Sequence, residues 1–478
     1  MKLLSAVIPA ILLFAETVYG QGGFSLQGEP GAGGALRGAS LGFMVSDVRT
    51  GQILASENAD FLLSPASVAK LFISAAALEM LGPGYRFGTR FLIQGSLDQA
   101  KGVLNGNLVV QGGGDPTAGS FYFLKNGKPD DPFLSLTDIL KNKGIRRITG
   151  SIVSDISAFA EWSVPGSWMW EDIGNYYGAT PGALNILDNT VSLIFNTPAS
   201  PGGQAVLIRT DPELPGISWI SEVRSGSGNR DLAYVYGSPW DTRRYIRGTI
   251  PAGRTGFGVR ASMPDPAEAY VDLLVKRLED AGISIGNEGQ SSNSATEKIP
   301  FHTIWSPPVA EICSVLNHES VNLLAEALVM QLAYKSTGSG DHDEGMELMR
   351  SFVRVNITPE PFFLEDGSGL SRFTAVTVRQ LNDLLLYMHR SENAEIFRTG
   401  LPLAGAGTLR AFRASDFPGN TLRAKSGSMT RVRAYAGYLV CQSGREVAFS
   451  VMVNNFPGTQ SEIFRSVERF LKEVRTRY

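Results

Sequence analysis

The chain has 478 residues and a formal net charge of −3, and its like-charged side chains do not gather in long runs. This balance does not favour a nucleic-acid-binding surface. Only two cysteines occur, Cys313 and Cys441, so a hydrophobic core must supply most of the stability. Their pairing is left open, and two separate buried thiols are favoured over a disulfide.

Residues 1–20 have the pattern of a secretory signal peptide. Lys2 precedes an apolar run from Leu3 to Ala15, and small residues lead to Gly20. The run is short for a membrane span, so we expect cleavage and export, with an uncleaved anchor as the alternative.

The first folded elements are predicted to be a hairpin, residues 41–45 and 52–55, followed by a turn at Ser64 and Pro65 that runs into an apolar helix ending at Leu81. Ser67 and Lys70 are three residues apart, so on a helix they share a face. A serine hydroxyl becomes a nucleophile when a base takes its proton, and a lysine can be that base when burial lowers its pKa. This spacing therefore predicts a nucleophile–base pair, the alternative being a helix cap with an exposed lysine.

From about residue 90 to 295, short strands separated by Gly- and Pro-rich turns are predicted. One helix is well marked there, because Asp265 is an N-cap candidate and Pro266 follows at the first helical position. The strand candidates are residues 91–93, 106–110, 147–153 and 191–195.

Helices return after residue 305, beginning with an apolar helix over residues 320–332, and the chain ends with another hairpin and helix. Because both ends consist of a hairpin and a helix, we expect them to form one α+β domain. The predicted division is 1–20 signal peptide, 21–92 and 296–478 catalytic domain, and 93–295 a mostly β insertion of about two small domains.

Two further motifs contain the groups that a lysine-activated serine requires. Lys425-Ser426-Gly427 lies on a predicted strand, where Lys425, Ser426 and Ser428 could bind a carboxylate and Gly427 would let a substrate backbone approach. The alternative is an exposed lysine before a turn. Ser320-Val321-Asn322 opens the apolar helix and is favoured over the similar triplet at residues 391–393. Ser-x-x-Lys, Ser-x-Asn and Lys-Ser-Gly in this order form the penicillin-recognising set.

With these motifs the chain resembles the class C penicillin-binding proteins, the D-alanyl-D-alanine carboxypeptidase and DD-endopeptidase family. The likeness covers most of the mature chain and implies a serine transpeptidase/β-lactamase-like fold with domains inserted between the first two motifs. The other matching stretches are residues 112–117, 261–266, 366–372 and 424–428.

The resemblance also implies a mechanism on peptidoglycan stem peptides or cross-links. Ser67 attacks the carbonyl of the penultimate D-alanine and Lys70 accepts its proton. Ser320 passes a proton to the leaving amine, with Lys425 tuning it, and Asn322 holds the substrate amide.

Further implied features concern the rest of the cleft. The backbone N–H groups of Ser67 and Ser428 form the oxyanion hole, and β-lactams are trapped as slow acyl-enzymes. Asp172 could pair with an amino group of the substrate, the alternative being an exposed acid beside a buried tryptophan. No metal or organic cofactor is expected. Export to the periplasm is expected, and peripheral membrane association is left open.

The sequence also allows other interpretations. The same scaffold could be a β-lactamase or an esterase, or a non-catalytic cell-wall-binding protein. A Gly-x-Ser-x-Gly match at residues 38–42 lacks the strand before it and the helix after it that a nucleophile there requires. The acidic stretch 341–344 is predicted to be a solvated loop.

Overall fold

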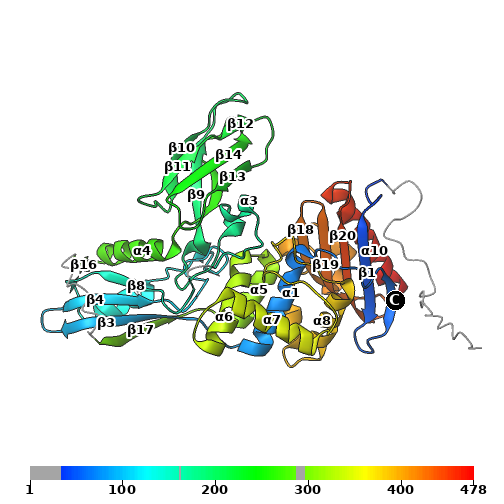
Figure 1. Ribbon diagram of the computed structural model, residues 1–478, viewed down its shortest axis with the longest axis horizontal. Helices are drawn as coiled ribbons and strands as arrows, with labels where there is room; N and C mark the ends of the chain where they lie inside the picture. Colours follow the sequence, from blue (N-terminus) through cyan, green and yellow to red (C-terminus); the bar gives the residue numbers. More distant parts are fainter. Residues whose placement is uncertain (1–33, 161–162, 287–296) are drawn as a thin grey trace, which may run out of the picture.

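The computed structural model describes residues 34–160, 163–286 and 297–478, so the predicted signal peptide lies outside the described residues. Figure 1 shows a helix-covered sheet joined to two smaller bodies that contain strands. The α+β prediction is confirmed, since the chain combines antiparallel sheets with packed helices.

The two ends of the chain meet in a five-stranded sheet with the order β18-β19-β20-β1-β2. The N-terminal strand β1 pairs antiparallel with β20 from the C-terminal hairpin. β1 is buried at seven of its eight positions, because both faces of the sheet are covered. The strands are β1 (Ser40–Asp47), β2 (Ile53–Glu57), β18 (Leu422–Met429), β19 (Val432–Val440) and β20 (Glu446–Asn454).

Helices cover both faces of this sheet (Figure 1). The C-terminal helix packs on one face, where Phe470 contacts Phe43 of β1 with ring centroids 4.8 Å apart. The other helices form the larger core on the opposite face. They are α1 (Lys70–Ala76), α5 (Val309–Glu319), α6 (Asn322–Thr337), α7 (His342–Asn356), α8 (Val378–Arg390) and α9 (Ala394–Thr399), with α10 (Gln460–Arg477) on the first face.

The predicted turn at Ser64 and Pro65 leads into a helical segment that begins at Ala66 and changes its geometry along its length. A 3-10 turn, η1 (Ala66–Ala69), leads into α1, and a π-helical turn, η2 (Ala77–Leu81), completes the segment. Every residue of α1 is buried, which fits its apolar sequence on all sides. The segment therefore runs through the core with its N-terminal turn facing the cleft described below.

The acidic stretch at residues 341–344 is a helix start, so the prediction of a solvated loop is wrong. Asp341 caps α7 by accepting a hydrogen bond from the Glu344 N–H, and His342 is buried. Sequence polarity suggested exposure, but the fold places a buried carboxylate opposite the histidine.

The first body of the insertion is a six-stranded sheet (Figure 1). The chain enters on β3 and returns antiparallel beside it on β17. The predicted boundary after residue 92 therefore lies within β3. The elements are β3 (Gly88–Asp98), β4 (Val103–Gln111), β7 (Arg147–Ile148), β8 (Ile152–Asp155), β16 (Ser284–Ile285), β17 (Lys298–Trp305), α2 (Leu134–Asn142), α4 (Pro266–Asp280), and the small hairpin β5 (Leu124–Lys125) and β6 (Lys128–Pro129).

Two local predictions can be compared directly with this body. Asp265 caps α4 with Pro266 at the first helical position, as predicted. The predicted strand 147–153 is two strands, because Gly150 crosses a neighbouring strand so closely that a Cβ would lie 2.6 Å from the Gly106 carbonyl oxygen.

The second body contains two further sheets around a separate apolar core. A segment with α3 (Trp170–Ile173) and the 3-10 turn η3 (Tyr176–Gly178) connects this body to the cleft. The strands are β9 (Thr190–Asn196), β10 (Val206–Asp211), β11 (Ser218–Ser221), β12 (Arg224–Gly226), β13 (Leu232–Tyr236), β14 (Arg243–Pro251) and β15 (Phe257–Ser262).

Cys313 and Cys441 are both free and buried, which confirms the prediction of two separate thiols. Across the described ranges we find no helix with the length and apolarity required to span a membrane.

Candidate active site

Ser67 and Lys70 face each other at the N-terminal end of the buried helical segment. The Lys70 Nζ donates a hydrogen bond to the Ser67 Oγ at 3.1 Å. Ala66, the residue before the serine, has φ 45°, an uncommon conformation for alanine. This sharp turn presents Ser67 at the edge of the core, where it remains partly accessible.

The Lys70 amine is fully buried and has two further acceptors. Its Nζ donates to the Asn322 Oδ1 at 2.6 Å and to the Ser368 carbonyl oxygen at 2.6 Å. Burial lowers the pKa of Lys70 to about 8, although the negative charges of Asp366 and Glu326 oppose this shift. The neutral amine needed for proton abstraction is therefore accessible near physiological pH.

A second lysine–serine pair lies beside the first. Lys425 on β18 donates to the Ser320 Oγ at 2.8 Å and to the Ser426 carbonyl oxygen at 2.7 Å. Burial, together with the charge of Lys70, puts the pKa of Lys425 well below its usual value. Ser320 has φ 62° and joins α5 to α6, so the helix begins at Asn322, two residues later than predicted.

The alternative triplet at residues 391–393 lies elsewhere. Ser391 and Asn393 both hydrogen-bond to Glu79, which is on η2 at the far end of the helical segment from Ser67. The triplet favoured from the sequence, residues 320–322, is therefore the one that contacts the Lys70 amine, through Asn322.

Asn322 has both ends of its side-chain amide engaged by the protein. Its Oδ1 accepts from Lys70, and its Nδ2 donates to the Tyr177 carbonyl oxygen at 2.8 Å. The residue therefore links the base to the inserted segment that forms the opposite wall.

The strand β18 lies directly against the turn that contains the serine. A Cβ at Gly427 would meet the Pro65 carbonyl oxygen at 2.3 Å and the Ser67 nitrogen at 3.0 Å. Gly427 therefore allows the backbone of β18 to approach the backbone around Ser67. The sequence instead predicted this space for a substrate backbone. Ser428 lines the cleft, and Ser426 reaches toward the Thr408 carbonyl oxygen at 3.4 Å.

Ser67, Ser320, Asn322 and Ser428 line one cleft of about 310 Å³, together with Asp172 from the insertion. Asp172 is 7% exposed and accepts a hydrogen bond from the Tyr177 hydroxyl at 3.2 Å. Burial raises the pKa of Asp172, and this hydrogen bond opposes the rise. Trp170, by contrast, is 59% exposed, so the alternative of an exposed acid beside a buried tryptophan is wrong.

The segment from Asp366 to Ser371 forms the floor beside Lys70 and has a buried anchor that sequence reasoning missed. The Asp366 carboxylate accepts from the backbone N–H groups of Gly369, Leu370 and Ser371. It also accepts from the Trp168 Nε1 at 2.9 Å. The match of residues 366–372 to the family pattern was one sequence signal for this segment. Nothing in the sequence indicated that Trp168, 198 residues earlier, is the partner of Asp366.

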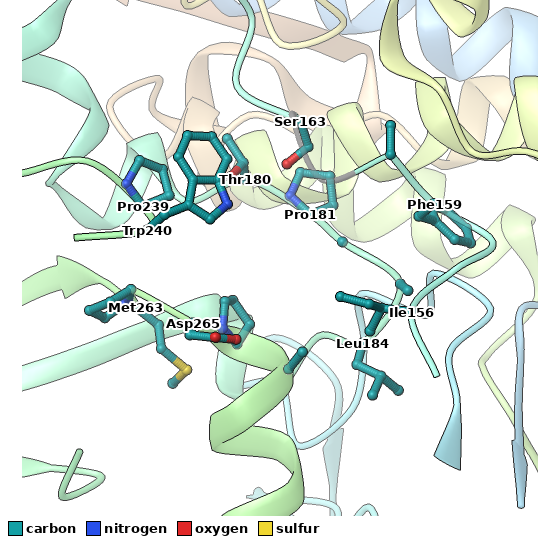
Figure 2. Close-up of a pocket in the computed structure, with 16 residues that line it drawn as sticks. Ile156, Phe159, Ser163, Thr180, Pro181, Leu184, Pro239, Trp240, Met263 and Asp265 are labelled. Atoms are coloured by element: carbon teal, nitrogen blue, oxygen red, sulfur yellow. The ribbon is translucent and has the colours of Figure 1, made fainter. Parts of the chain in front are cut away.

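A second cavity, of about 280 Å³, lies within the insertion, lined by residues between Ile156 and Ala267. Figure 2 shows Trp240 and Pro239 on one side of it, facing Met263 and Asp265 on the other. Its lining contains no residue of the three motifs, whereas Ser67, Ser320 and Asn322 line the first cleft.

Comparison with known proteins agrees with this geometry. Residues 31–474 match the model of the D-Ala-D-Ala carboxypeptidase 3 (S13) family. A D-alanyl-D-alanine carboxypeptidase of Actinomadura sp. strain R39 is 28% identical over 446 residues, covering 89% of this chain and 79% of that protein. The carboxypeptidase DacB of Haemophilus influenzae is 26% identical over 433 residues, covering 88% and 86%.

The fold has a counterpart among solved structures. Penicillin-binding protein 4 of H. influenzae superposes with a TM-score of 0.74 at 23% sequence identity, covering 92% of this chain and 96% of that structure. The predicted penicillin-recognising fold is thereby confirmed. The chain belongs to the D-Ala-D-Ala carboxypeptidase 3 (S13) family, the class C penicillin-binding proteins.

Proposed function

We propose that this protein hydrolyses peptidoglycan peptides at D-Ala-D-Ala ends or D-alanyl cross-links through an acyl-enzyme on Ser67. The observation that carries the proposal is the direct contact between the Ser67 Oγ and a buried lysine amine whose pKa is about 8. Family membership supplies the reaction class, serine-type DD-peptidase.

In the proposed acylation step, the Ser67 Oγ attacks the carbonyl carbon of the penultimate D-alanine while the Lys70 Nζ takes the hydroxyl proton. The backbone N–H groups of Ser67 and Ser428 hydrogen-bond the developing oxyanion. The contact between Gly427 and the Ser67 turn supports this pairing, because it keeps the two backbones adjacent.

Collapse of the tetrahedral intermediate breaks the peptide bond and releases the amine. The Ser320 hydroxyl delivers its proton to that amine and regains one from the Lys70 ammonium, so the Ser67 proton ends on the leaving amine. Lys425, which donates to the Ser320 Oγ, sets the orientation of the hydroxyl. Water then hydrolyses the ester of Ser67 and restores the enzyme. Asn322 orients the substrate amide and Lys70 together, since it already binds Lys70.

Substrate binding is assigned to two ends of the cleft. Ser426 and Ser428 on β18, with Gly427 between them, bind the terminal carboxylate beside the Lys425 amine. Asp172 binds an amino group on the stem-peptide side chain at the opposite wall. Its burial supports this role, because a cation there would meet a carboxylate that water does not fully screen.

The proposal includes acylation by β-lactams and a periplasmic location. Penicillin-binding protein 4 of H. influenzae has been solved in complex with a β-lactam. Export rests on the signal-like residues 1–20.

The decisive experiment compares wild type with Ser67→Ala using a fluorescent penicillin and a pentapeptide ending in D-Ala-D-Ala. We expect wild type to be labelled covalently and to release D-alanine, and the variant to do neither. Equal labelling of the two proteins would exclude Ser67 as the nucleophile. Rapid penicillin turnover without D-alanine release would identify a β-lactamase.

A further inference from the structure

A buried acid–histidine pair lies behind the segment that contacts Lys70. Glu326 projects from the apolar helix α6, one turn after Asn322, and is 0% exposed. Its Oε2 is 2.9 Å from the Nε2 of His342 on α7, which is 5% exposed. A charged pair is costly to bury, so its partners indicate what it does.

The partners of Glu326 lead directly to the base. Its two carboxylate oxygens accept from the backbone N–H groups of Gly367, at 3.1 Å, and Ser368, at 2.8 Å. The carbonyl oxygen of the same Ser368 accepts from the Lys70 Nζ at 2.6 Å. A single residue, Ser368, therefore connects the Glu326 carboxylate with the Lys70 amine.

We infer that Glu326, held by His342, is a positioning residue that orients Lys70 and controls its charge through the segment from Gly367 to Ser368. This inference rests on the proposed role of Lys70 as the base for Ser67. Glu326 does not touch the cleft, since it faces the back of the segment, and it acts on the reaction only through Lys70.

The charges around the two groups determine the direction of the effect. Three charged or titratable groups face Lys70: Glu326 from α6, Asp366 from the segment 366–371, and Lys425 from β18. Burial opposes ionisation of Glu326, but hydrogen bonds from His342, Ser368 and Gly367 outweigh burial and lower its pKa. Burial and the charge of Glu326 instead raise the pKa of Asp366. Glu326 is thus the better-stabilised negative charge behind Lys70.

Removing that charge has two separable consequences. The protonated form of Lys70 loses a favourable interaction, so the pKa of Lys70 falls. In addition, an amide at position 326 offers one oxygen to the two N–H groups that a carboxylate satisfies, so the Ser368 carbonyl shifts and the amine is misplaced. The first effect shifts the pH dependence of acylation, and the second lowers the maximal acylation rate.

The test measures the second-order rate of acylation by a fluorescent penicillin between pH 5.5 and 10 in full-length protein. For Glu326→Gln we expect the rising limb of the pH–rate profile to move to lower pH by about one unit. The shift stays this small because the Asp366 carboxylate remains near Lys70. We expect the plateau rate to fall about tenfold or more. Glu326→Asp keeps the charge and should keep the limb within about 0.3 units of wild type.

The matched control is Glu347→Gln on α7, the same chemical change at a side chain that is 57% exposed and pairs with Arg350 and Arg354. It should leave the limb and the plateau unchanged. A folded Glu326→Gln protein whose limb coincides with that of wild type would overturn the inference.

A second variant keeps the test decisive if Glu326→Gln does not fold. His342→Gln retains an N–H donor toward Glu326 but cannot carry a positive charge, and Glu326 raises the pKa of His342. Its limb should therefore stay in place or move to higher pH, opposite to Glu326→Gln, and a downward shift would overturn the inference. Wild-type labelling at Ser67 in the same series tests the proposed function independently.

Discussion

At the scale of single residues, the chemistry depends on how the protein handles buried charge. Lys70 and Lys425 are both 0% exposed, and burial is the largest cause of the lowered pKa of each. An ammonium in water would be a poor base, because its proton would stay in place at neutral pH. Burial thus favours the neutral amine of both lysines, which the proposed mechanism requires of Lys70 as the base.

The first residue-scale prediction concerns Lys70. Acylation by penicillin should rise with pH and reach half its maximum near pH 8, because the neutral amine is the active form and the pKa is about 8. Lys70→Arg keeps a proton at all accessible pH values, so its rate should fall about 10²–10⁴-fold. Stopped-flow labelling measures both. A Lys70→Arg protein with near wild-type rates would remove Lys70 from the mechanism.

The second residue-scale prediction uses the left-handed conformation of Ser320. Ser320→Ala and Ser320→Gly both remove the hydroxyl that accepts from Lys425, so both should lose most of their D-alanine release. Glycine adopts φ 62° without the Cβ penalty, so Ser320→Gly should be more stable than Ser320→Ala by about 1 kcal/mol. Urea unfolding measures the difference, and equal stability would show that this turn is not strained.

At the scale of elements, the site depends on the close packing of β18 against η1. These elements are far apart in the sequence and touch through a glycine that has no room for a side chain. The oxyanion hole proposed above needs both backbones, so this contact determines its width.

The element-scale prediction is that Gly427→Ala pushes β18 away from the Ser67 turn. A Cβ there would meet the Pro65 carbonyl oxygen at 2.3 Å, so labelling by penicillin should fall about 10²-fold or more, since small misplacements are costly. Gly258→Ala on β15 is the matched control, because its Cβ would meet only the Ile194 Cδ1, at 3.8 Å. Unchanged labelling in Gly427→Ala would separate β18 from the oxyanion hole.

At the scale of the whole molecule, the insertion is tied into the catalytic body at the floor of the cleft. The Trp168 indole, from the segment before α3, donates to the Asp366 carboxylate. Asn322 binds the Tyr177 carbonyl of the same inserted region. The inserted region therefore does more than extend outward, since two of its contacts support residues beside Lys70.

The whole-molecule prediction is that Trp168→Phe weakens this connection. The variant keeps an aromatic ring but loses the donor to a buried carboxylate, which should cost about 1–3 kcal/mol of unfolding free energy. We also expect a lower kcat/KM for the pentapeptide, because the segment that contacts Lys70 loses an anchor. Urea unfolding and D-alanine release are the measurements. Full stability and activity would show that Trp168 is dispensable for the anchor.

Local patterns predicted most of the elements, because caps, turns and apolar periodicity act over a few residues. Asp265 and Pro266 opened α4 as expected. The errors came from contacts between residues far apart in the sequence. Residues 341–344 were predicted to be a solvated loop, yet His342 is buried against Glu326 of another helix. Glu326 interrupts an otherwise apolar helix, a signal that was readable but had no assigned partner.

By itself, the sequence determined the reaction class and the α+β architecture, because motif order and residue type carry that information along the chain. Only the tertiary structure decided which side chains meet Lys70 and which glycine packs against Ser67. The physical reason is that pKa values and hydrogen-bond geometry depend on distance and burial in space. Glu326 contacts Gly367 and Ser368, and Trp168 contacts Asp366, in the segment beside Lys70. Glu326 follows Lys70 by 256 positions and Trp168 follows Ser67 by 101, separations that no local pattern records.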